Sequence, residues 1–291
     1  MNDRIATQRE AARRGLQLRR SLSIPREHAV NVFDVASSIG IEVQFLDSPS
    51  LEGMFYRGPD PKVFLPSLKH RPRGRVAFSC AHELGHFDLG HGTRVDKYLG
   101  ENEDRRREFS LEEAAADVFA STFLMPRPAV LARFSCRGWS LVRTTEVDLY
   151  RIAVELDVGY GTLCQHLRHG LGLVDDVWVK CRARFAPKSL REAIAPRCGG
   201  CFRLVVVDEH WPTVPVDLEI GDCFAAPAVL RLKLPASLRE EDEHDGLRIF
   251  RATASGETKA EVHGQPITIR IARAGYCGLL KYRYLEEVEE E

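Results

Sequence analysis

The chain has 291 residues, of which 44% are hydrophobic and 29% charged, with a formal net charge of -1. This composition is ordinary for a folded protein and excludes a collagen, a low-complexity array and a disordered chain. The near-neutral charge gives no overall attraction to nucleic acid or anionic membranes, so any such binding needs a local patch. Domains usually contain roughly 100–200 residues, which favours two or three compact units.

The first 24 residues are basic and lack the apolar core of a signal peptide. No stretch of the sequence is apolar for long enough to cross a bilayer. We therefore expect a cytoplasmic protein without membrane contact, whose amino-terminal arm (1–24) is solvated and partly helical. Contact between this arm and DNA or RNA is the alternative. The eight cysteines are expected to be reduced thiols in a long chain without a secretory signal.

The predicted elements of the first half are a helix, a small sheet and two longer helices. Apolar residues at helical spacing predict a helix over 25–40, and alternating apolar residues predict a strand over 41–45. The further elements predicted here are strands at 53–56 and 63–65, helices at 74–89 and 111–125, and a polar loop or lid at 90–107.

The second half changes from a helical to a strand-like pattern near Cys198. Residues 138–174 are predicted to be helices with polar breaks, and 187–194 a short helix. Strands are predicted at 202–207, 228–234, 247–250, 267–271 and 279–284, before an acidic tail at 286–291. This order predicts an α+β protein with four parts: the arm (1–24), a mixed α/β domain (25–135), a helical module (136–196) and a β-rich domain with the acidic tail (197–291).

The segment His82-Glu83-Leu84-Gly85-His86 is the one that indicates a metal site. Two histidines four positions apart on a helix lie on one face, so both imidazoles can bind one ion. Glu83 lies beside that face and can reach a water held on the metal. Zinc suits two neutral imidazoles and one carboxylate, because the fourth tetrahedral position then stays open for water. The alternative is an amphipathic helix with surface histidines.

The next predicted helix supplies a third ligand. Glu112 and Glu113 precede its apolar run, and Asp117 follows Glu113 by one helical turn. We predict that Glu113 binds the metal. Asp117 is predicted to accept a hydrogen bond from the outer nitrogen of a ligand histidine, which fixes the orientation of that ring. The alternative for Asp117 is an ordinary surface charge.

Four runs occur in the order found in a known family: RVAF at 75–78, AHELGH at 81–86, EAAADVFA at 113–120 and FLMP at 123–126. This order, with LEGMF at 51–55, resembles the ImmA/IrrE family of metallo-endopeptidases over 25–130, and more weakly through 174. The resemblance implies a zincin-like, gluzincin-like core with His82, His86 and Glu113 as zinc ligands and Glu83 as the base. Members are bacterial or phage-borne. Several cleave a helix-turn-helix repressor in stress response or in the regulation of mobile elements.

Two roles around the site stay open from the sequence. Zinc enzymes of another class use a later histidine as third ligand, after a glycine three positions past the second histidine. Leu89 occupies that position here, so His91 is expected to pack or cap rather than bind metal. A donor for the oxyanion of the reaction is also needed, and the sequence does not choose between Tyr56, His91, Arg94 and Tyr98.

Residues 149–169 have the pattern of a helix-turn-helix, with the turn at 157–159 and a second helix at 162–169. In DNA-binding proteins that helix enters the major groove, and its contacts here would come from Gln165, His166, Arg168 and His169. The preferred interpretation is a small helical unit that packs on the peptidase.

Cys198 and Cys201 form a CxxC pair that, with Cys181 and Cys223, could complete a structural zinc site. A single CxxC pair is weak support for such a site.

These patterns together predict a zinc-dependent endopeptidase that hydrolyses a bond in a specific protein, with residues 90–107 gating the cleft. The partner implied by the resemblance is a helix-turn-helix transcriptional repressor. One rival is a DNA-binding or sensor protein that keeps a peptidase-like fold. The other is a small-molecule metallohydrolase, because zinc-activated water attacks many carbonyls.

Overall fold

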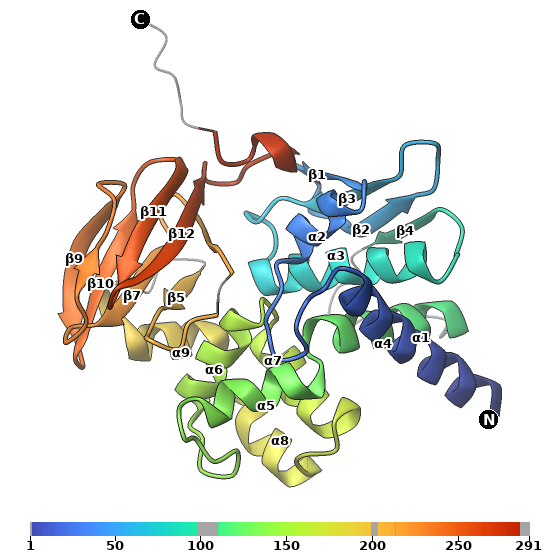
Figure 1. Cartoon of the computed structure of the whole chain (residues 1–291), viewed down its shortest axis with the longest axis horizontal. Coiled ribbons are helices and arrows are strands. Elements are labelled where there is room, and N and C mark those ends of the chain that lie inside the picture. The colour runs from blue at the N-terminus through green and yellow to red at the C-terminus, as the bar shows by residue number, and fades with distance from the viewer. Residues whose placement is uncertain (1, 98–109, 199–202, 213, 286–291) are drawn as a thin grey trace, which may run out of the picture.

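The computed structural model describes residues 2–97, 110–198, 203–212 and 214–285, which form an α+β protein (Figure 1). The first part contains both helices and strands: α1 (Asn2–Ser21), α2 (Val32–Ser38), β1 (Glu42–Leu46), β2 (Leu51–Tyr56), β3 (Lys62–Pro66), α3 (Arg73–Asp88), β4 (Arg94–Lys97) and α4 (Leu111–Leu124). Among the described residues, no helix is both long and apolar enough to cross a membrane.

Helices make up the second part: α5 (Arg127–Ser135), α6 (Glu146–Glu155), α7 (Tyr160–Gln165), the π-helix η2 (His166–Gly170), α8 (Asp176–Ala183), α9 (Pro187–Ile194) and the 3-10 turn η3 (Pro196–Cys198). Strands make up the third: β5 (Leu204–Val206), β6 (Val216–Glu219), β7 (Cys223–Pro227), β8 (Leu232–Lys233), β9 (Leu238–His244), β10 (Leu247–Ala252), β11 (Gly256–Val262), β12 (Gln265–Ala272) and β13 (Gly278–Leu279), followed by the 3-10 turn η4 (Leu280–Tyr282).

A five-stranded sheet in the order β13-β1-β3-β2-β4 supports α3. The pair β1–β3 is parallel, whereas β3–β2, β2–β4 and β1–β13 are antiparallel. Successive side chains of a strand point to opposite faces, and Val43, Phe55 and Val63 are therefore buried in the core with Val76 of α3. The sheet thus fixes the helix that carries both histidines of the predicted motif.

The predicted helix over 25–40 is shorter in the structure, where α2 begins at Val32. Asn31 precedes it, and its side-chain oxygen accepts hydrogen bonds from the amides of Phe33 and Asp34. An asparagine in this position starts a helix because it satisfies amides that have no partner inside the helix. The predicted loop over 90–107 contains strand β4, which pairs with β2. Its remainder from 98 lies outside the described residues.

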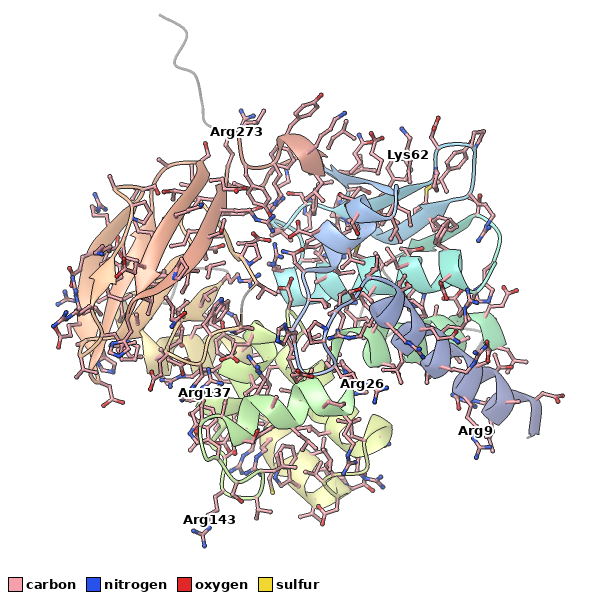
Figure 2. The ribbon with its side chains drawn as sticks, in the orientation of Figure 1. Arg9, Arg26, Lys62, Arg137, Arg143 and Arg273 are labelled. Atoms are coloured by element: carbon pink, nitrogen blue, oxygen red, sulfur yellow. A yellow bond between two sulfur atoms is a disulfide. The ribbon has the colours of Figure 1, made fainter. Side chains whose placement is uncertain are left out.

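The basic amino-terminal segment is not the solvated arm that the sequence predicts. It forms α1, which packs along α4, and Ala11 and Gly15 allow the two helices to approach closely. Arg19 is 2% exposed and donates hydrogen bonds to the carbonyls of Phe123, Pro25 and His28. The prediction rested on the number of arginines alone. The guanidinium of Arg19 is buried in the fold, whereas others, such as that of Arg9, project outward (Figure 2).

The predicted helix-turn-helix corresponds to α6 and α7, but its second helix differs from the prediction. α7 begins at Tyr160 and passes into the π-helix at His166. The turn holds Asp157 at φ 53°, and this carboxylate is buried against Arg73 at the start of α3. The turn therefore packs on the first part of the chain, which is the arrangement that the sequence analysis prefers.

The β-rich region consists of two four-stranded sheets, in the orders β5-β7-β10-β9 and β6-β12-β11-β8, with an apolar core between them. The first sheet also packs on the helices, and the hydroxyl of Tyr150 on α6 donates to the carbonyl of Leu204. The strand predicted at 279–284 is wrong. Only Gly278–Leu279 is extended, and it pairs with β1 before the chain turns at η4.

The expectation of reduced thiols is also wrong for one pair, because Cys198 and Cys223 are joined by a disulfide. Cys198 ends η3 and Cys223 begins β7, so the bond ties the end of the helical part to the β-rich region. Cys181 is an exposed free thiol on α8, and Cys201 lies outside the described residues. In the described part of the chain, these cysteines do not assemble as a metal site.

Candidate metal centre

Helix α3 places His82, Glu83 and His86 in the interior, where each is at most 5% exposed. The helix begins after Pro72 and ends in a turn at Gly90, whose φ of 79° suits glycine. The four-residue spacing puts both histidine rings on one face, one helical turn apart. Their Nε2 atoms lie 2.9 Å from each other, so both rings point at the same place.

Glu113 reaches this place from the first turn of α4. Its Oε2 is 3.3 Å from Nε2 of His82, and its Oε1 is 3.5 Å from Nε2 of His86. Ser110 caps the helix, since its hydroxyl accepts a hydrogen bond of 3.1 Å from the amide of Glu113. One donor atom from each of His82, His86 and Glu113 lies within 4.8 Å of the others, which is a geometry that could hold a metal ion.

Gly85 explains how α3 and α4 come close enough for this arrangement. A Cβ at Gly85 would lie 3.1 Å from Cα of Ala116 and 3.2 Å from Cβ of Phe119. These contacts are tighter than nearly all real Cβ contacts, so a larger residue would push α4 away from α3. The glycine between the two histidines therefore keeps Glu113 within reach of the rings.

The Nδ1 atom of each histidine ring, on the side away from the metal site, also contacts a polar side chain. Nδ1 of His82 lies 2.8 Å from Oδ1 of Asp117, and a carboxylate can only accept, so this nitrogen carries a proton. Nδ1 of His86 lies 2.8 Å from Nδ1 of His91. With Nδ1 engaged on both rings, Nε2 is the atom that each ring directs at the site.

His91 packs beside the site, as the sequence analysis expects, but its contact with His86 was not predicted. Helix α3 ends in a Schellman turn, in which the amide of His91 donates to the carbonyl of His86 and the amide of Gly90 to that of Phe87. This turn folds His91 back onto the helix. Arg57 holds it there by donating to the carbonyls of His91 and Phe87, each at 2.7 Å. The signal in the sequence was Gly90, which marks the turn that brings His91 to His86.

The carboxylate of Glu83 is positioned by strand β2. A Cβ at Gly53 would lie 2.4 Å from Oε1 of Glu83, so any side chain there would displace the carboxylate. Glu83 is 1% exposed on α3, beside the two histidines. Glycine at position 53 therefore leaves room for the carboxylate in its observed place.

The charges of the site favour a cation. Burial lowers the pKa of His82, but the carboxylates of Asp117 and Glu113 outweigh it and raise the pKa to about 10. Hydrogen bonds to His82 and His86 lower the pKa of Glu113 well below its usual range. Two imidazole nitrogens and a carboxylate oxygen directed at one point fit a zinc ion.

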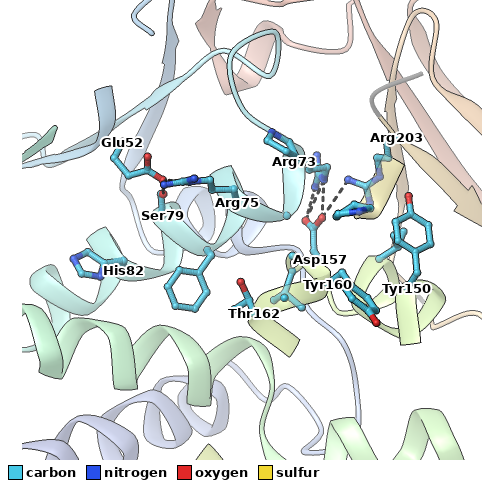
Figure 3. Close-up of a pocket in the computed structure, with 18 of the residues that line it drawn as sticks. Glu52, Arg73, Arg75, Ser79, His82, Tyr150, Asp157, Tyr160, Thr162 and Arg203 are labelled. Atoms are coloured by element: carbon cyan, nitrogen blue, oxygen red, sulfur yellow. Dashed lines mark hydrogen bonds and ion pairs between the residues drawn. The ribbon is translucent and has the colours of Figure 1, made fainter. Parts of the chain in front are cut away.

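A cleft of about 480 Å³ opens beside His82 and Glu83 (Figure 3). Its walls come from β2, the first three turns of α3, Asp117 of α4, α6, the turn before α7 and the start of α7, α9 and Arg203. Tyr56 and His91, two of the predicted oxyanion donors, do not line this cleft. Arg94 belongs to β4, and Tyr98 lies outside the described residues. The cleft therefore reaches the metal centre at His82 and Glu83.

The fold and the site are those of a metallopeptidase. Residues 36–168 match the family model described as the IrrE N-terminal-like domain, a peptidase family. This segment contains the whole metal centre and the α6–α7 pair, and over it the chain is similar to the ImmA/IrrE family. No curated protein matches the chain.

Proposed function

We propose that the protein is a zinc-dependent endopeptidase. His82, His86 and Glu113 bind the metal, and Glu83 is the general base. The observation that carries the proposal is the convergence of two Nε2 atoms and a buried carboxylate on one point, with a second buried carboxylate beside it at the edge of a cleft. Asp117 and His91 orient the two rings.

Zinc bound at this point supplies Lewis-acid chemistry, because it polarises a carbonyl and lowers the pKa of water to about 7. Glu83 accepts one proton from the attacking water as the water oxygen bonds to the carbonyl carbon. The same carboxylate then passes this proton to the amide nitrogen as the C–N bond breaks, which gives a new carboxyl terminus and a free amine. Gly53 keeps the carboxylate in place for both transfers.

A protein substrate fits the cleft better than a small ester or amide does. The cleft extends from His82 along α3 to Arg73 at its first turn. Nine residues of helix span about 13 Å, which corresponds to about four residues of extended peptide. By resemblance to its family, the substrate is a helix-turn-helix repressor, and cleavage removes repression in stress response or in a mobile element.

The DNA-binding alternative has less support. Of its four predicted contacts, His166 is buried with Nε2 2.9 Å from the carbonyl of Met125, and Arg168 pairs with Asp176. Side chains used inside the fold are poor candidates for reading base edges, which requires free donors and acceptors. Gln165 and His169 alone remain for such contacts.

The test is a comparison of new amino termini in a lysate of the source organism. Zinc-loaded wild type is added to one sample and Glu83→Gln to a matched sample, and new termini are identified by mass spectrometry. The proposal predicts at least one regulatory protein cut at a single site by the wild type only. Equal cleavage by both proteins would contradict the role of Glu83.

A further inference from the structure

The end of the cleft farthest from the metal centre is lined by guanidinium groups. Arg73 at the start of α3 and Arg203 just before β5 both contact Asp157, in the turn between α6 and α7 (Figure 3). Helix α9 packs on α6 and contributes Arg191 to the same cleft. Figure 3 shows Arg203 beside Tyr150 and across the cleft from His82.

The carboxylates at this end are already shared. Asp157 accepts from Nε and Nη2 of Arg73 at 2.9 and 2.8 Å, and also from Nη1 of Arg203 at 3.2 Å. The second carboxylate near Arg73 is Asp217, which is 2% exposed and binds Arg270 through both of its oxygens. Each of these carboxylates therefore already contacts two guanidinium groups.

Arg203 and Arg191 both have a guanidinium nitrogen that makes no hydrogen bond with the described residues. The side chain of Arg203 is 12% exposed, and Asp157 is its one acceptor among the described residues. Burial lowers the pKa of Arg203, against the opposing attraction of Asp157, Asp217 and Asp222. In the described ranges, no side chain or carbonyl accepts a hydrogen bond from Arg191, although its Nε is buried. Two guanidinium groups that line the cleft therefore have N–H donors without an acceptor among the described residues.

We propose that Arg191 and Arg203 form an anion-binding subsite of the substrate cleft, which takes an Asp or Glu side chain of the protein substrate. This inference rests on the proposed function and specifies its substrate. Arg73 marks the position of the subsite, about 13 Å along α3 from His82, so the acidic residue lies about four positions from the bond that is cut.

A substrate carboxylate suits the site in charge and in size. A guanidinium offers donors in a fixed fork that matches a carboxylate, and such charge-assisted pairs are stronger than neutral hydrogen bonds. The cleft of about 480 Å³ has room for a peptide with its side chains. Binding of an acidic side chain at this subsite therefore fixes which peptide bond of the substrate lies at the metal.

The test measures binding without turnover. Zinc-loaded Glu83→Gln protein of full length is immobilised, and a library of random dodecapeptides with amidated carboxyl termini is passed over it at low salt. Amidation ensures that carboxylates come from Asp and Glu side chains. The same background carrying Arg191→Gln is the test variant. Arg143→Gln is the matched control, because Arg143 is exposed and projects from a loop away from the cleft (Figure 2).

The proposal predicts retained peptides enriched in Asp or Glu, with retention about tenfold weaker for Arg191→Gln and unchanged for Arg143→Gln. Arg191→Glu should instead favour peptides with Lys or Arg. The proposal is overturned if the retained peptides have no acidic bias, if the bias survives Arg191→Gln, or if no peptide is retained. Failure of the endopeptidase function is a separate result, because it shows as the absence of cleavage that depends on Glu83, whatever the peptides do.

Discussion

The most informative single substitution is Gly53→Ala, because it moves the proposed base without touching a metal ligand. The added Cβ would lie 2.4 Å from Oε1 of Glu83, whereas an ordinary contact begins at 3.4 Å. The carboxylate must therefore retreat by about 1 Å, and a misplacement of this size costs roughly 10²-fold in rate. That factor corresponds to about 2.7 kcal/mol of transition-state stabilisation.

The assay is the rate of cleavage of the protein substrate identified by its new amino terminus, with zinc content measured on the same samples. We expect Gly53→Ala to keep one zinc per chain and to lose about 10²-fold in kcat/KM. Gly92→Ala is the matched control, because a Cβ at Gly92 meets nothing within 4 Å. A Gly53→Ala enzyme as fast as the wild type would refute the placement of Glu83 as the base.

Three further predictions concern other parts of the chain. His91→Phe should weaken zinc binding about 10- to 100-fold in a chelator competition, because His86 loses its partner at Nδ1; an unchanged affinity would exclude this role. Arg19→Met should reduce the free energy of unfolding in urea by about 1–3 kcal/mol, because buried carbonyls lose their donor; no change would show that α1 is held by its apolar contacts alone. Burial lowers the pKa of His166, so the unfolded state binds the proton more tightly and native stability falls as the pH drops below about 6.5. Thermal unfolding of His166→Gln should lack this loss between pH 7.5 and 5.5, and parallel curves for variant and wild type would contradict it.

The helices of the site were predictable because their signals are local. The spacing of His82 and His86, and the alanine-rich run after Glu113, place both elements within a residue or two of the observed bounds. Helical periodicity also implies that both rings share a face. The distance between α3 and α4 depends on Gly85, whose role is visible only when the facing helix is known.

The parts that the sequence did not predict depend on contacts between distant segments. The two-residue strand β13 is too short to show alternation, and it exists because it pairs with β1 more than two hundred positions earlier. Arg19 looks like any other arginine of a basic segment until the carbonyl of Phe123 is placed beside it. The cluster of arginines at the cleft could not be inferred either, since the pairing of Arg203 with Asp157 depends on the tertiary fold.

The central claim is that His82, His86 and Glu113 hold one zinc ion. The direct test is the metal content of purified protein after zinc is supplied, for the wild type and for the double variant His82→Ala, His86→Ala. The account predicts about one zinc per wild-type chain and none in the double variant. Zinc that persists in the double variant would contradict the site and move the metal to other residues of the chain, such as its free thiols.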